Sequence, residues 1–119
     1  MNTNQIAIHV NNAARFGMAP VSPLQPLVDL IRAGYSVDLD DGPMTGNGHR
    51  YRYLVVNGAH IGMRENLRAL AALAKRCNGL DADGLRALQS AEMDREDAAK
   101  ANPEHAINRT RAVRANLGR

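Results

Sequence analysis

The amino-acid sequence predicts an α+β fold, in which a small antiparallel or mixed sheet of three to four short strands, with a central hairpin, is packed by helices. Two observations indicate this fold class. Segments in which apolar residues alternate with more polar ones occur before residue 64, and helical apolar spacing dominates the chain after it. Strands followed by a run of helices are typical of α+β domains, whereas α/β domains alternate the two.

The first strand is predicted at residues 4–10. Ile6, Ile8 and Val10 alternate with more polar neighbours, which is the period of a strand with one buried face.

A helix is predicted next, beginning at Ser22-Pro23 and ending before Gly34. Serine is a preferred N-cap, proline fits the first helical position, and glycine commonly follows a helix end. Between these signals, apolar residues recur at helical spacing, at Leu24, Leu27, Val28 and Ile31.

Three more strands are predicted after this helix. Alternating apolar residues mark residues 35–39, 50–55 and 59–63. The Asn57-Gly58 dipeptide is well suited to a type I′ turn, so the last two of these strands should form a hairpin. Residues 42–48, with the sequence GPMTGNG, are predicted to be a flexible connection of the hairpin type, because three glycines and a proline interrupt them.

Helices are predicted at residues 64–77, 81–101 and 102–117. The spacing places Cys77, the only cysteine, on the apolar stripe of the first of them, and Asp81 is suited to cap the second. The second half of that helix is rich in charge and is expected to face solvent. We therefore expect one α+β domain at residues 1–101 and a basic C-terminal helical appendage at residues 102–119.

The net charge of +3 is concentrated at the C-terminal end. Residues 1–102 contain eleven basic and eleven acidic residues, so the excess comes from residues 103–119. The chain has one cysteine, no apolar run near the roughly 20 residues that span a bilayer, and no export signal at its start. We expect a soluble, cytoplasmic protein with no membrane partner.

Catalytic and metal-binding patterns are weak in this sequence. No two histidines have the i,i+4 spacing of a zinc pair on a helix, and the one aspartate-rich run departs from a calcium loop. Asp38 and Asp40 are expected to form cross-strand ion pairs with Arg50 and Arg52. No catalytic residue, metal or cofactor is predicted, although a pocket that joined His60 to Asp38 or Asp40 would favour a small hydrolase.

Exposed charge and an adaptable glycine-rich loop favour binding over chemistry. The residues predicted to contact a partner are Asn47, His49, Arg50, Arg52, Arg109, Arg111 and Arg114. The leading hypothesis is a non-enzymatic protein that binds and inhibits or modulates a host protein or nucleoprotein complex. Small accessory proteins of phages and plasmids act in this way, for example against host defence systems such as CRISPR.

Two alternative functions stay open. A small DNA- or RNA-binding regulator would make weak phosphate contacts through the C-terminal arginines. The scarcity of aromatic rings for base stacking, and of any recognised nucleic-acid-binding motif, weighs against it. A small hydrolase is the less favoured alternative. Homodimer formation also stays open, because the apolar half of the helix at residues 82–101 is available to a second copy.

Overall fold

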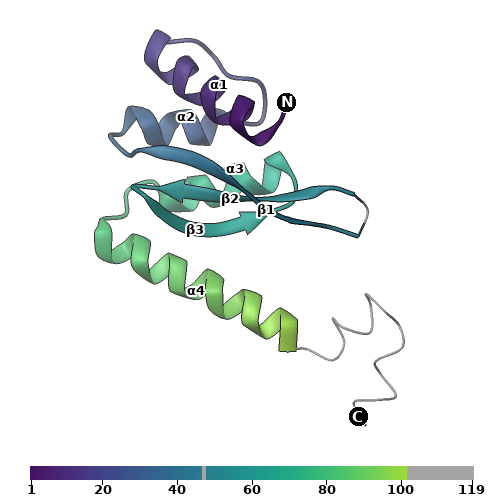
Figure 1. Ribbon diagram of the computed structural model, residues 1–119. Coiled ribbons are helices and arrows are strands. Elements are labelled where there is room, and N and C mark those ends of the chain that lie inside the picture. The colour runs from purple at the N-terminus through teal and green to yellow at the C-terminus, as the bar shows by residue number, and fades with distance from the viewer. Residues whose placement is uncertain (47, 102–119) are drawn as a thin grey trace. The chain divides into compact units, whose positions relative to one another are not determined.

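The computed structural model describes residues 1–46 and 48–101, with side chains described through Asp97. Its elements are α1 (Thr3–Phe16), α2 (Gln25–Arg32), β1 (Val37–Met44), β2 (Arg50–Val56), β3 (Ala59–Arg64), α3 (Leu67–Cys77) and α4 (Ala82–Ala101) (Figure 1). The strands form one antiparallel sheet in the order β1-β2-β3, so the predicted α+β fold is confirmed.

The chain divides into two compact units. The first comprises Met1–Gln89, and the second begins at Ser90, within α4. The predicted appendage at residues 102–119 lies outside the described residues. Among the described helices, none is long and apolar enough to cross a membrane.

The predicted strand at residues 4–10 is wrong, because these residues belong to α1. Ile6, Val10 and Ala13 are buried at the i, i+4 and i+7 spacing of one helix face, whereas Ile8 is 52% exposed. A seven-residue window with three alternating apolar residues fits a strand, but the next turn of the chain adds the buried alanine that only a helical period explains.

A capping box fixes the start of α1. The Asn2 side chain accepts a hydrogen bond from the Gln5 backbone N–H at 2.8 Å, and the Gln5 side chain accepts one from the Asn2 backbone N–H, also at 2.8 Å. The backbone N–H groups of Asn2 and Gln5 thereby gain acceptors at the first turn of the helix. Gly17, with φ of +69°, ends the helix.

The start of α2 also differs from the prediction. Ser22 does not cap a helix and Pro23 does not open one, because the Leu24 N–H donates to the Val21 carbonyl oxygen and closes a turn over these residues. The helix begins at Gln25, and Pro26 stands in its first turn, where its missing N–H costs nothing.

Two backbone reversals predicted from glycine are confirmed. Gly34 has φ of +104°, and the Tyr35 N–H donates to the Leu30 carbonyl oxygen at 3.0 Å, which closes the end of α2. Between β2 and β3, Asn57 and Gly58 have φ of 51° and 82°, as a type I′ turn requires.

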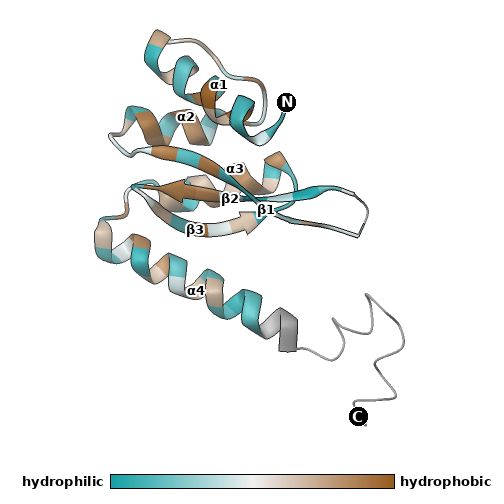
Figure 2. Ribbon diagram, viewed as in Figure 1, coloured by the Kyte–Doolittle hydropathy of each residue, from teal (hydrophilic) through white to brown (hydrophobic). Residues whose placement is uncertain are grey.

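The core of the first unit lies between the sheet and its helices. α2 packs against both α1 and α3, all three helices contact the strands, and apolar residues gather on the facing sides (Figure 2). Leu85 and Leu88 of α4 join this core as predicted, and the Asp81 side chain accepts the Gly84 N–H at 2.8 Å and caps that helix. Cys77 is buried, as predicted from its place on the apolar stripe.

α3 begins later than the sequence indicates. Arg64 ends β3, and the Asn66 side chain caps the helix by accepting the Ala69 N–H at 2.7 Å.

Candidate functional site

The residues predicted to bind a partner divide into two groups. His49, Arg50 and Arg52 lie in and beside the turn that joins β1 to β2. The others, Asn47, Arg109, Arg111 and Arg114, fall outside the described residues. The described part of the candidate site lies at the end of the β1–β2 hairpin. We call residues 44–46 and 48–50 the hairpin end.

Thr45 closes the turn of the hairpin end. Its backbone N–H donates to the His49 carbonyl oxygen at 2.5 Å, and its hydroxyl accepts the His49 N–H at 3.1 Å. The Thr45 carbonyl oxygen accepts the Gly48 N–H at 3.1 Å. Residues 42–44 belong to β1, so the predicted flexible connection of residues 42–48 is shorter than expected.

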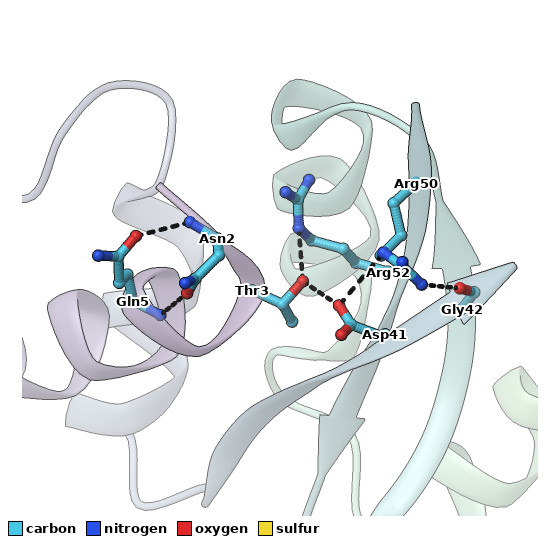
Figure 3. A network of polar contacts seen from close by, with 7 residues as sticks. All are labelled: Asn2, Thr3, Gln5, Asp41, Gly42, Arg50 and Arg52. Atoms are coloured by element: carbon cyan, nitrogen blue, oxygen red, sulfur yellow. Dashed lines mark hydrogen bonds and ion pairs between the residues drawn. The ribbon is translucent and has the colours of Figure 1, made fainter. Parts of the chain in front are cut away.

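Arg50 is held from two directions at the base of the hairpin end. Its Nη1 donates to the Gly42 carbonyl oxygen at 2.9 Å, and its Nε lies 3.8 Å from Oδ1 of Asp41 (Figure 3). The Arg50 side chain keeps 41% of its surface exposed. Met44, which is paired with Arg50 across the strands, is 53% exposed. A cation and a thioether side chain thus stand together in solvent.

Arg52 ties the sheet to α1. Its Nε donates to the Thr3 hydroxyl oxygen at 3.0 Å, and that hydroxyl in turn donates to Asp41 (Figure 3). Thr3 is only 7% exposed although it carries a polar group. The three side chains connect the first residue of α1 with both β1 and β2, so Arg52 has a structural role that its place beside a loop did not suggest.

The predicted ion pairs of Asp38 and Asp40 with the two arginines are wrong. Side chains alternate between the faces of a strand, and the register places Asp41, not Asp40, opposite Arg52. Asp41 therefore reaches the arginine side of the sheet, and the other two aspartates project from the opposite side.

Asp40 instead meets His60 of β3. Its Oδ2 lies 2.5 Å from Nε2 of His60, and the His60 ring packs edge-on against Tyr53 with the centroids 5.3 Å apart. Both polar side chains are about half exposed, at 52% and 49%.

The acid–histidine pair lies at the exposed surface of the sheet. A hollow of about 160 Å³ beside the β2–β3 turn is lined by other residues, among them Val56, Leu85 and Gln89. Within residues 1–46 and 48–97, no group of three or more metal-ligating side chains comes together.

Side chains occupy both outer edges of the sheet. On β1, the Asn11 amide donates to the Val37 carbonyl oxygen at 3.2 Å, and the Asp38 carboxylate accepts the Leu39 N–H at 2.8 Å. On β3, the Gln89 amide donates to the His60 carbonyl oxygen at 2.8 Å. These contacts cover backbone groups that an added strand would need.

Sequence reasoning missed Thr3 and Asp41. The only local signal for the first was the capping box between Asn2 and Gln5, which places Thr3 at the start of a helix.

Comparisons of the chain with protein families, curated proteins and solved structures found no match.

Proposed function

We propose that this chain is a non-enzymatic binding protein that docks on a protein or nucleoprotein partner through the hairpin end and modulates that partner. The observation that carries the proposal is the exposed pair of Met44 and Arg50, which stand opposite each other at the end of a hairpin. Methionine and arginine are enriched at the centres of protein interfaces, where one supplies adaptable apolar contact and the other a planar cation.

The support beneath this pair favours specific binding. Thr3 and Asp41 connect the base of the hairpin to α1, and Thr45 closes its turn. A contact surface held in place by the fold loses less conformational entropy on binding than a free loop does.

The covered sheet edges favour recognition by side chains. Addition of a partner strand requires free backbone groups at an edge, and Asn11, Asp38 and Gln89 already bond to such groups. The hairpin end lies where β1 and β2 meet and offers exposed side chains, so binding there needs no backbone pairing.

Affinity capture from an extract of the organism that encodes the chain tests the proposal. The wild-type chain is compared with the double variant Met44→Ala/Arg50→Ala, and retained proteins and nucleic acids are identified. The double variant is expected to recover at least about tenfold less of the specific partner, because loss of two central contacts typically has an effect of this size.

A matched control pair lies at the C-terminal end of α1, the end opposite to Thr3. The Arg15 guanidinium lies 5.2 Å from the centroid of the Phe16 ring, and Phe16 is 63% exposed, so this is a second exposed pair of an arginine and an apolar residue. Arg15→Ala/Phe16→Ala should leave the recovery unchanged. Equal recovery by the two double variants would refute docking through the hairpin end, and recovery of nucleic acid alone would favour a nucleic-acid-binding regulator.

A further inference from the structure

The guanidinium of Arg52 is held in one orientation, but only its Nε makes a hydrogen bond within the described part of the chain. The hydrogen bond from its Nε to the Thr3 hydroxyl oxygen fixes the plane of the group. Across the part of the chain that the structure describes, Thr3 is the one hydrogen-bonding partner of this side chain, and its two terminal nitrogens point away from Asp41 and the rest of the polar network (Figure 3). Arg52 is partly exposed, so these nitrogens can meet a ligand.

Two terminal N–H groups in a fixed plane form a fork that matches the two oxygens of an oxyanion. Arginine usually loses side-chain freedom when it binds, and the bond to Thr3 removes part of that freedom before the ligand arrives.

The charges around the fork favour an anion. Arg64 stands directly opposite Arg52 in the β2–β3 register, so no acidic side chain occupies the cross-strand position on that side. The residue opposite Arg52 in the β1–β2 register is Asp41, whose carboxylate already accepts the Thr3 hydroxyl and pairs with Arg50. The first turn of α1, which begins at Thr3, has no acidic residue.

The same surroundings favour a single carboxylate over a chain of phosphates. Asp41 is exposed on β1 directly opposite Arg52, on the same side of the sheet. A nucleic-acid strand carries one negative charge about every 3.4 Å, so a strand that reached the fork would place further phosphates against this carboxylate. An aspartate or glutamate side chain of a protein partner need not have further negative charges beside it.

We propose that Arg52 is the binding site for one carboxylate side chain of a protein partner, which it receives through its two terminal nitrogens. This inference rests on the proposed function and adds the chemistry of the group that the partner presents beside the hairpin end.

The test is an NMR titration of the full ¹⁵N-labelled chain with sodium acetate as the probe, at constant ionic strength set by sodium chloride. The Nε–Hε resonance of Arg52 is assigned by its loss in Arg52→Lys. Arg32 is the matched reference, because its Nη2 already donates to the carbonyl oxygens of Ala13 and Met18. Acetate is expected to shift the Arg52 resonance at least about threefold more than that of Arg32.

A second variant tests the role of the fixed orientation. In Thr3→Val the Nε loses its partner, and the selective shift of Arg52 should fall by about half or more, because the fork is no longer held. Equal shifts of Arg52 and Arg32 in the wild-type chain would overturn the site.

A titration with inorganic phosphate as the second probe distinguishes a carboxylate ligand from a phosphate ligand. A shift of Arg52 similar to or smaller than that with acetate supports a carboxylate ligand, and a response to phosphate at least about threefold stronger would overturn the choice of carboxylate. Because these probes are small ions, failure of the titration leaves docking through the hairpin end intact. Failure of the capture experiment with a positive titration would reject the docking and keep the site.

Discussion

Replacement of two isoleucines in α1 distinguishes the helix from the strand that alternation suggests. Ile6 is 1% exposed and Ile8 is 52% exposed. Isoleucine to alanine removes three carbon atoms, worth about 0.8 kcal/mol each when fully buried, and the cavity left behind adds to this. Ile6→Ala should therefore lower the free energy of unfolding by about 3 kcal/mol.

Ile8→Ala should have a much smaller effect. Because the Ile8 side chain is half exposed, its truncation loses only about half of the free energy of burial that Ile6→Ala loses. Alanine also favours the helix by about 0.4 kcal/mol over isoleucine. We expect a loss below about 1 kcal/mol, measured by urea unfolding followed by far-UV circular dichroism with an unchanged m-value. In a strand, Ile6 and Ile8 would share one buried face, so equal losses for the two variants would refute the helical assignment.

Three further perturbations test the local structure. Thr3→Val should lower the free energy of unfolding by about 1–2 kcal/mol, because the Nε of Arg52 loses its acceptor, and Thr3→Ser should recover most of it; an unchanged melting temperature for the valine variant would contradict this. Gly58→Ala should cost about 1–2 kcal/mol at φ of +82°, whereas Gly46→Ala, with no atom near its new methyl group, should be neutral; equal denaturation midpoints would argue against the turn. Cys77 should react with a thiol reagent at least about a hundredfold more slowly in the folded chain than in urea, and comparable rates would show that it is accessible.

Local signals predicted two features correctly, the hairpin turn between β2 and β3 and the C-terminal end of α2. The turn at Asn57-Gly58 and the end of α2 at Gly34 each depend on a few adjacent residues whose backbone preferences are strong. α1 was misassigned for the opposite reason. Three alternating apolar residues fit both periods over so short a window, and burial against α2 and β1, which lie later in the sequence, favours the helix.

The candidate site was predicted only in part. Arg50 was expected to be exposed and charged beside the loop, and it is. Its partner was misassigned because the strand register decides which aspartate shares its face, and neither sequence spacing nor composition gives that register. Thr3 was missed because it lies 38 and 49 positions from Asp41 and Arg52, and only the tertiary fold brings them together.

The central claim is that the hairpin end recognises a partner through its exposed side chains. The most direct measurement is the dissociation constant for the partner recovered by capture, determined for the wild-type chain, Met44→Ala/Arg50→Ala and Arg15→Ala/Phe16→Ala. We predict at least about tenfold weaker binding for the hairpin variant and less than about a twofold change for the control, with both variants folded. Equal dissociation constants for all three chains would contradict the claim.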